Sequence, residues 1–231
     1  MSRDHGTAPM HALKDDAPTL SRVKHGYTTG ARTLASRSVT GLARTRVTPN
    51  ALTVSGVSLC LVAALIVPFE NRGQLLFYWL AAGIFVLGSI LDILDGALAR
   101  AGGRSTVFGA FLDSTTDRVG EGAMLAAIAL VFARAGNDTA VVFTIFGVAG
   151  SFLVPYVRAK AESLGLRGDV GLGSRAERVV VITAGLVLAP WGLLPWAIYL
   201  LALTSWFTVL QRVLHVRKQL LSGGTNVQEQ R

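Results

Sequence analysis

Cysteine is almost absent from this 231-residue chain, which contains a single one, Cys60. A disulfide framework is therefore excluded, and no group of His and Cys residues has the spacing of a zinc site. Charged residues are also scarce, at 16%, and only 14 residues are acidic. Hydrophobic residues make up 51% of the chain, and no acidic, Pro-rich or repetitive stretch is present. This composition excludes a disordered protein, a collagen and a coiled coil, and it argues against most soluble enzymes.

Long apolar runs occupy most of the chain instead. A helix needs roughly 20 mostly apolar residues to cross a bilayer. Six runs reach or approach that length: 51–69, 74–98, 108–133, 139–160, 178–194 and 195–214. The first run starts too late in the chain, and is too long, to be a cleavable signal peptide. We predict an all-α integral membrane protein, in which residues 31–218 form a catalytic bundle of six transmembrane helices and residues 219–231 form a cytoplasmic tail.

Positive charge is concentrated on one side of this predicted bundle. Of the 22 Lys and Arg residues, only Arg72 and Arg134 fall on one side and Arg118 falls within a run. The other 19 lie in four segments that six spans place together: 1–50, 99–107, 158–178 and the tail from 212. Because cytoplasmic loops carry the excess of Lys and Arg, both termini are predicted to face the cytoplasm, in the cytoplasmic membrane. The net charge of +8 then indicates contact with lipid headgroups rather than with nucleic acid.

The N-terminal region divides into two predicted parts. Residues 1–30 show no periodicity and are predicted to be a disordered cytoplasmic tail. Between Thr33 and Arg46, apolar residues recur at helical spacing among arginines. This pattern is typical of an amphipathic helix that lies in the membrane interface, with an unstructured basic arm as the alternative.

Acidic residues gather where a membrane protein usually avoids them. Five lie in or beside the second and third runs: Asp92, Asp95, Asp113, Asp117 and Glu121. Carboxylates in membrane spans are costly and usually mark function. Asp92 and Asp95 are three residues apart, and Asp113 and Asp117 are four apart, so each pair lies on one face of its helix. Because a short turn makes the two helices antiparallel neighbours, the two pairs are expected to converge.

Converging carboxylates repel one another unless a cation neutralises them, and such oxygen ligands suit Mg²⁺ or Mn²⁺. The pattern therefore predicts a site for two metal ions that clamps a phosphoryl or pyrophosphate group. Gly96 and Gly109 would allow a ligand to approach the backbone closely, and Arg100 could bind phosphate. Two alternatives remain at this point: buried ion pairs with Arg100, Arg104 and Arg118, or the cation pathway of a transporter.

These residues resemble the signature of the CDP-alcohol phosphatidyltransferase family, D-x2-D-G-x2-A-R-x8-G-x3-D-x3-D. The chain matches every fixed position and every gap with Asp92, Asp95, Gly96, Ala99, Arg100, Gly109, Asp113 and Asp117. The resemblance implies a six-helix, homodimeric membrane enzyme that transfers a phosphatidyl group from a CDP-activated lipid to an alcohol and releases CMP. It also implies that Asp92, Asp95 and Asp113 hold the metals, while Asp117 is both a metal ligand and the general base.

The same resemblance implies a binding site for the CDP-lipid. Its residues would be Asn50, Ala51, Leu52, Thr53, Gly96, Arg100, Thr106 and Gly109. Without the resemblance, Pro49 and Asn50 indicate only the start of a helix.

A second group of charges suggests which alcohol is used. Its cations end the fourth run, open the fifth and end the sixth: Arg158, Lys160, Arg175, Arg178 and Arg212. So many cations beside one cytoplasmic cavity predict a site for an anionic acceptor such as a phosphate monoester. Anchoring of the spans by cytoplasmic positive charge is the alternative, and so is pairing of Arg178 with Glu162 or Glu177.

The stretch from Tyr156 to Arg178 is similar to that of the actinobacterial and archaeal branch of the family, the phosphatidylinositol-phosphate synthases, which join inositol 1-phosphate to a CDP-lipid. Pro155, Arg158 and Ser174 depart from that branch. The branch that uses glycerol 3-phosphate tends to have Pro shortly after the third Asp, where this chain has the run 114–116, Ser-Thr-Thr. We therefore expect CDP-diacylglycerol and inositol 1-phosphate as substrates, with glycerol 3-phosphate as the alternative acceptor.

Overall fold

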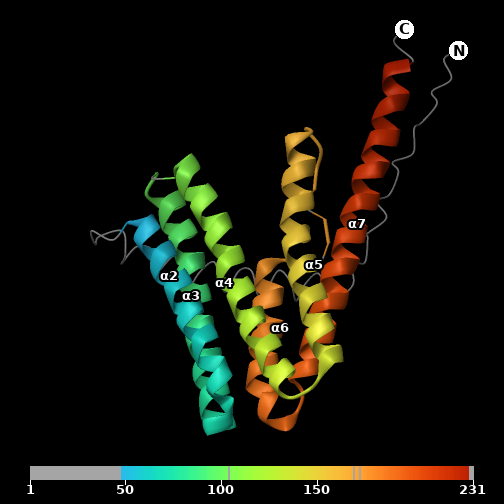
Figure 1. The fold of residues 1–231 in the computed structure, drawn as a ribbon. Helices are drawn as coiled ribbons and strands as arrows, with labels where there is room; N and C mark the ends of the chain where they lie inside the picture. Colours follow the sequence, from blue (N-terminus) through green and yellow to red (C-terminus); the bar gives the residue numbers. More distant parts are fainter. Residues whose placement is uncertain (1–47, 104, 169, 172, 229–231) are drawn as a thin grey trace, which may run out of the picture.

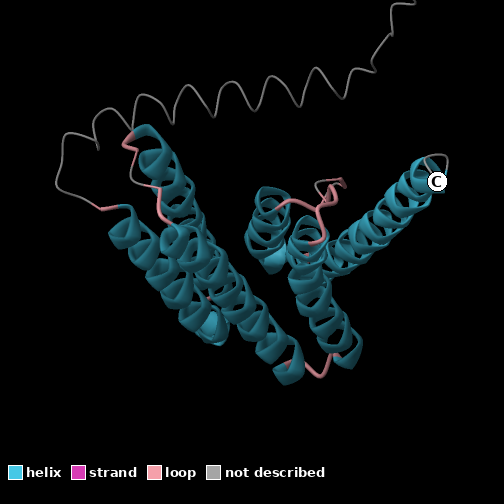
Figure 2. Cartoon of the chain, turned by 90° about the horizontal axis from the view of Figure 1, so that it is seen from above, coloured by secondary structure: helices cyan, strands magenta, loops and turns pink. Residues whose placement is uncertain are grey.

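The structure is a computed structural model that describes residues 48–103, 105–168, 170–171 and 173–228. The predicted tail at 1–30 and the predicted amphipathic helix at 33–46 lie outside the described residues. Every regular element in the described part of the chain is a helix (Figures 1 and 2). The elements are α2 (Pro49–Ile66), η1 (Val67–Arg72), α3 (Gln74–Ala101), α4 (Val107–Arg134), α5 (Asp138–Ser163), α6 (Arg175–Leu188), η2 (Ala189–Trp191) and α7 (Leu194–Gln228). The all-α prediction is confirmed.

Four of the helical segments are long and apolar enough to cross a membrane. They are Pro49–Arg72, Gln74–Arg100, Asp138–Ser163 and Leu194–Leu221. The other two expected spans differ for separate reasons. Helix α4 has 28 residues, but charged residues interrupt its apolar run. Helix α6 has only 14 residues, or about 21 Å of helix against the roughly 30 Å of a hydrocarbon core.

The fifth and last helices have different bounds from those expected. The helix that contains the run 178–194 starts at Arg175, which was expected to open it, and its α-helical part ends at Leu188, before the end of the run. A short 3-10 helix follows, in which Pro190 lacks the N–H needed to continue the α-helix. The last helix extends past the sixth apolar run, 195–214, as far as Gln228.

Threonine hydroxyls cap the starts of two helices beside the site. The Thr48 hydroxyl accepts the Ala51 N–H at 3.3 Å before α2, and the Thr106 hydroxyl accepts the Gly109 N–H at 2.9 Å before α4. Such caps satisfy N–H groups that a first helical turn leaves without partners. The Thr106 cap fixes where α4 begins, and with it the depth of the carboxylates on that helix.

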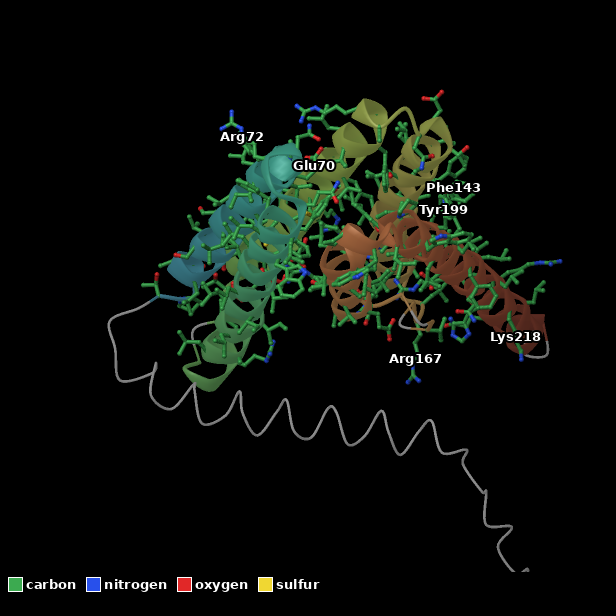
Figure 3. The ribbon with its side chains drawn as sticks, turned by 90° about the horizontal axis from the view of Figure 1, so that it is seen from below. Glu70, Arg72, Phe143, Arg167, Tyr199 and Lys218 are labelled. Carbon is green, nitrogen blue, oxygen red and sulfur yellow. The ribbon has the colours of Figure 1, made fainter. Side chains whose placement is uncertain are left out.

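The helices pack as two groups, joined by α6 and by a direct contact of α4 with α5. Helix α2 packs against α3 and α4, while α5 packs against α7. Helix α6 contacts both α3 and α7, and lies between the groups in Figure 1. Between α5 and α7, the ring centroids of Phe143 and Tyr199 lie 4.7 Å apart. Figure 3 labels both residues. The two groups therefore share a central element, whose first residue is Arg175.

The hydrophobic core occupies one end of the bundle. Its largest fully buried apolar side chains come from the start of α3, the second half of α4, α6 and the start of α7: Phe85, Met124, Leu125, Ile128, Ile182, Leu186, Ile198 and Leu201. In α3 and α4, these positions lie far from the α3–α4 turn. The acidic residues lie nearer that turn, so apolar packing and polar chemistry are separated along the helix axes.

Candidate active site

Three carboxylates from two helices meet near the α3–α4 turn. Oxygen atoms of Asp92 and Asp95 on α3 and of Asp113 on α4 all lie within 4.8 Å of one another. Asp92 and Asp95 are 8% and 3% exposed. Three of the four carboxylates expected to converge therefore lie together, while Asp117 is not part of this group. A cluster this tight and buried calls for a positive partner.

Asp95 shows how the cluster fits a metal ion. One of its carboxylate oxygens, Oδ2, accepts a hydrogen bond from the Thr53 hydroxyl of α2. The other, Oδ1, is buried and has no hydrogen-bond partner. A buried carboxylate oxygen without a partner is costly, and oxygen atoms from three carboxylates are the ligands that Mg²⁺ and Mn²⁺ prefer. The residues therefore fit a divalent cation.

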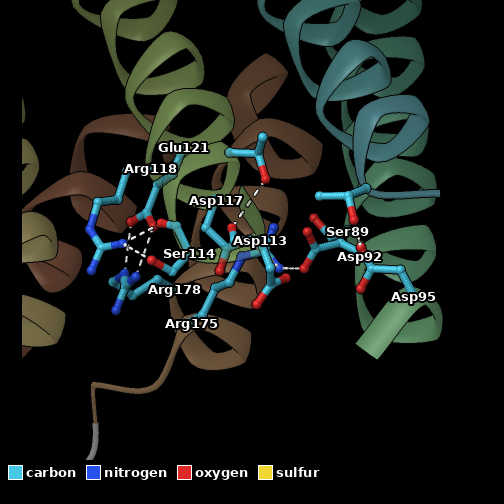
Figure 4. A network of polar contacts seen from close by, with 12 residues as sticks. Ser89, Asp92, Asp95, Asp113, Ser114, Asp117, Arg118, Glu121, Arg175 and Arg178 are labelled. Atoms are coloured by element: carbon cyan, nitrogen blue, oxygen red, sulfur yellow. Dashed lines mark hydrogen bonds and ion pairs between the residues drawn. The ribbon is translucent and has the colours of Figure 1, made fainter. Parts of the chain in front are cut away.

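The guanidinium group of Arg175, on α6, also contacts these carboxylates. Nη1 of Arg175 contacts Oδ2 of Asp92 and lies 2.8 Å from Oδ1 of Asp117, as Figure 4 shows. Asp117 lies one helical turn beyond Asp113 on α4. Arg175 thus bridges α3 and α4, and supplies positive charge to the carboxylates in this structure.

A second ion pair connects α6 to α4 (Figure 4). Nε and Nη2 of Arg178 donate to the two carboxylate oxygens of Glu121 at 2.7 and 2.8 Å. The sequence assigned no role to Glu121, and the partners considered for Arg178 were Glu162 and Glu177. The one available signal was the spacing of Glu121, which lies four residues after Asp117 and so on the same face of α4.

Two cavities flank the carboxylates. The first, of about 140 Å³, is lined by Pro49, Asn50, Thr53, Asp95, Gly96, Ala99, Arg100, Ser105, Thr106, Gly109, Ala110 and Asp113. Six of the eight residues predicted to bind the CDP-lipid are among them. The other two differ: Ala51 is exposed, and Leu52 packs against Leu98 in a small apolar cluster.

The second cavity, of about 420 Å³, lies on the other side of the carboxylates. Its lining is Asp113, Ser114, Asp117, Arg118, Glu121, Val154, Pro155, Arg158, Gly171, Gly173, Ser174, Arg175, Arg178 and Arg212. It contains four of the five cations predicted to bind the acceptor. Lys160, the fifth, is exposed at the end of α5 and does not line the cavity. Asp113 lines both cavities, so the two cavities meet at this carboxylate of the cluster.

Like Arg175 and Arg178, the other two predicted cations of the second cavity have partners within the protein. Arg158 is about half exposed and forms an ion pair with Glu162 at 2.8 Å. Arg212 is 7% exposed and donates from Nε to the Val170 carbonyl at 2.9 Å. Arg212 therefore holds the segment between α5 and α6 against α7 while it lines the cavity.

Residues 46–216 match the sequence profile of the CDP-alcohol phosphatidyltransferase family, and the chain belongs to this family. It is accordingly an integral membrane enzyme rather than a transporter. The phosphatidylinositol phosphate synthase of Mycolicibacterium smegmatis is 40% identical over 182 residues, which cover 75% of this chain and 79% of the relative. The archaetidylinositol phosphate synthase of Methanothermobacter thermautotrophicus is 40% identical over 143 residues, or 60% of this chain and 70% of that protein.

Solved structures of a related enzyme have the same fold. The crystal structure of Mycobacterium tuberculosis phosphatidylinositol phosphate synthase with CDP-DAG bound matches with a TM-score of 0.70 and 30% identity, covering 80% of this chain and 94% of that one. The same enzyme in complex with manganese and citrate matches with a TM-score of 0.70 and 31% identity, covering 79% and 88%. The acidic cluster of the present chain is consistent with divalent metal binding.

Proposed function

We propose that the protein transfers the phosphatidyl group of CDP-diacylglycerol to a hydroxyl of inositol 1-phosphate and releases CMP, a step of phospholipid biosynthesis. The observation that carries the proposal is that the two cavities meet at Asp113, which lines both. One cavity is lined by the signature residues of a CDP-alcohol phosphatidyltransferase, and the other is rich in arginine. A donor in the first and an anionic acceptor in the second would meet at Asp113. The names of the relatives support inositol phosphate as the acceptor.

The first cavity would bind the cytidine diphosphate. Asn50 and Thr53 would contact it from α2, with Ala51 and Leu52 holding the backbone of that turn. Gly96 and Gly109 leave room beside the pyrophosphate, and Thr106 and Arg100 add polar groups. This assignment is supported by the lining residues of the cavity.

The second cavity would bind the acceptor phosphate through Arg158, Arg175 and Arg212. Guanidinium groups bind phosphate in a planar, two-point geometry, which suits a monoester. Lys160 would attract anions from a greater distance. Arg178 also lines this cavity, but three of its nitrogen atoms already donate to Glu121 and to the Gly173 carbonyl.

We assign the metal ligands as Asp92, Asp95, Asp113 and Asp117, for two Mg²⁺ or Mn²⁺ ions. When bound, these ions would neutralise the pyrophosphate and stabilise the charge on the departing CMP. Asp117 takes the proton from the acceptor hydroxyl. The hydroxyl oxygen then forms a bond to the phosphorus that carries diacylglycerol, and the bond from that phosphorus to CMP breaks.

The membrane arrangement we propose has six spans, with both termini in the cytoplasm and the site near the cytoplasmic face of the cytoplasmic membrane. Helix α4 supports the count, because its 28 residues extend about 42 Å beside α2 and α3. A homodimer is part of the proposal. A site at this depth lets acyl chains stay in the bilayer while CDP and the acceptor reach it from water.

CMP release by the purified protein tests the reaction. The protein receives CDP-diacylglycerol and Mg²⁺ with inositol 1-phosphate, glycerol 3-phosphate, free inositol or serine in separate tubes. We expect release with inositol 1-phosphate alone. Release only with glycerol 3-phosphate would retain the site and overturn the acceptor assignment, while no release in any tube would overturn the proposed reaction.

Asp117→Asn is the matched variant for the same assay. Loss of the general base is expected to reduce the rate by about 100-fold or more. Asp138→Asn is the control, because Asp138 is exposed at the start of α5, at the opposite end of the bundle. A near-normal rate for Asp117→Asn in protein that remains folded in detergent would show that Asp117 is not the base.

A further inference from the structure

The ion pair between Glu121 and Arg178 is a buried part of the second cavity that the proposed chemistry does not use. The two residues are 5% and 7% exposed. Both oxygens of Glu121 are engaged, by Nε and Nη2 of Arg178 at 2.7 and 2.8 Å (Figure 4). A two-point contact of this kind fixes direction as well as distance, because the guanidinium and carboxylate planes must align.

Arg178 also fixes the segment that precedes its own helix. Its Nη1 donates to the Gly173 carbonyl at 2.9 Å. Next along the chain, Ser174 and Glu177 form a capping box: the Ser174 N–H donates to Glu177 at 3.0 Å, and the Ser174 hydroxyl accepts the Glu177 N–H at 3.4 Å. The backbone around Arg175, the first residue of α6, is therefore fixed before it by the Gly173 contact and after it by the capping box.

The two ion pairs between α4 and α6 run in register. Arg175 and Arg178 are three residues apart on α6, while Asp117 and Glu121 are four apart on α4. Both spacings place two side chains on one helix face. The pair of Glu121 with Arg178 thus sets how the first turn of α6 is rotated about its axis and how far along α4 it lies. These two settings decide whether Arg175 faces Asp92 and Asp117.

We infer that Glu121 is a positioning residue: through its two-point contact with Arg178 it aims Arg175 at the reacting groups, and so builds the anion site without touching substrate. The inference rests on the proposed function and deepens it. It assigns the buried pair to the acceptor side of the reaction, where the bound anion is a phosphate monoester.

Two simpler roles for this pair predict tighter, not weaker, anion binding when Glu121 loses its charge. If Arg178 bound the acceptor phosphate directly, removing the charge of Glu121 would free Arg178 and tighten anion binding. If Glu121 only added negative charge to the cavity, removing it would again favour an anion. Weaker anion binding after loss of a carboxylate is expected only if Glu121 acts by position.

The experiment measures binding of inorganic phosphate and of inositol 1-phosphate to the full chain in detergent by titration calorimetry. The proteins are wild type, Glu121→Gln, Arg175→Gln and the double variant. We expect Glu121→Gln to weaken phosphate binding by about tenfold, as is typical for loss of a residue that orients a ligand-binding group. The double variant should bind no more than about twofold more weakly than Arg175→Gln, because Glu121 acts through Arg175.

Two results would overturn the inference. One is phosphate binding by Glu121→Gln that equals or exceeds that of wild type. The other is independent losses that multiply in the double variant. The matched control is Glu70→Gln, which removes an equally buried carboxylate. Glu70, labelled in Figure 3, lies in η1 beyond the end of α2, whereas the site lies beside the start of α2, about 27 Å of helix away. It should leave phosphate binding unchanged.

Arg178→Lys covers the case in which Glu121→Gln does not fold. It keeps the charge but loses the two-point contact and the bond to Gly173. We expect weaker phosphate binding here too, in protein that elutes as wild type on gel filtration, and wild-type binding would overturn the inference. Phosphate binding requires no turnover, so it separates the two proposals. Wild-type protein that binds phosphate but releases no CMP with inositol 1-phosphate would refute only the proposed function, and absence of phosphate binding would refute the positioning role.

Discussion

Thr53 illustrates how much a single side chain contributes at the residue scale. Its hydroxyl, on α2, donates to Oδ2 of Asp95 on α3 and also lies 3.2 Å from the Pro49 carbonyl. Because Oδ2 is held in this way, the partnerless Oδ1 of Asp95 is the atom left to bind a cation. Groups that orient a metal ligand commonly affect metal affinity nearly as much as the ligands do. Thr53, predicted as a nucleotide contact, thus also acts on the metal cluster.

Thr53→Val tests this contact, since valine keeps the shape of threonine and removes the hydroxyl. We expect Mn²⁺ affinity, measured by titration calorimetry, to fall by about 10- to 100-fold. Thr53→Ser should restore most of it. Thr204→Val is the control, because the Thr204 hydroxyl donates only to backbone carbonyls of its own helix. Wild-type affinity in Thr53→Val would show that the hydroxyl does not orient Asp95.

At the scale of helices, Gly56 on α2 and Gly88 on α3 allow the two helices to pack closely beside the site. A Cβ on Gly88 would lie 2.7 Å from the Gly56 carbonyl oxygen, and a Cβ on Gly56 would lie 2.9 Å from the Gly88 carbonyl oxygen. These contacts involve backbone, which cannot move aside as a flexible side chain can. The close approach allows Thr53 of α2 to reach Asp95, two turns beyond Gly88 on α3.

Gly88→Ala should therefore destabilise the protein, by about 1–3 kcal/mol, because its methyl group overpacks this crossing. Gly83→Ala is the matched control on the same helix, since a Cβ there meets nothing within 4 Å. It should be neutral or stabilising by about 0.5–1 kcal/mol, as alanine is the better helix former. Unfolding in detergent, followed by fluorescence, compares the two. Equal stabilities of the two variants would mean that the helices do not cross as tightly as described.

At the scale of the whole molecule, the bundle has an apolar end and a polar end. The core residues of α3 and α4 lie far from the α3–α4 turn, and the carboxylates lie close to it. Burial of the core holds the helices together, while the other end tolerates like charges because arginines of α6 and cations can neutralise them. This division lets one end bind charged groups without loss of the packing that holds them in place.

The proposed membrane topology can be tested with single cysteines. In a Cys60→Ala background, Asp138→Cys lies at the first residue of α5 and Ser163→Cys at its last; both positions are exposed. If both termini are cytoplasmic, an impermeant maleimide should label Asp138→Cys in intact cells. It should label Ser163→Cys only after permeabilisation. Labelling of Ser163→Cys in intact cells would reverse the proposed orientation.

Local patterns predicted much of this protein correctly. Apolar runs predicted its helices, and the spacing of Asp92, Asp95 and Asp113 predicted a metal-binding cluster that the structure brings together. Bounds were less accurate where hydropathy alone set them. Helix α6 starts at Arg175 because Ser174 caps it, and the spacing of Ser174 and Glu177 is a capping-box pattern that hydropathy does not detect.

The sequence by itself determined the helical class, the family signature and the face of each helix on which the carboxylates lie, because these depend on periodicity within one helix. Only the tertiary structure decided which cation meets which carboxylate. Pairing of Arg175 with Asp117 and of Arg178 with Glu121 depends on the rotation of α6 against α4, helices whose paired residues lie more than 50 positions apart in the chain. Such a rotation is set by packing of the whole bundle, and no local pattern encodes it.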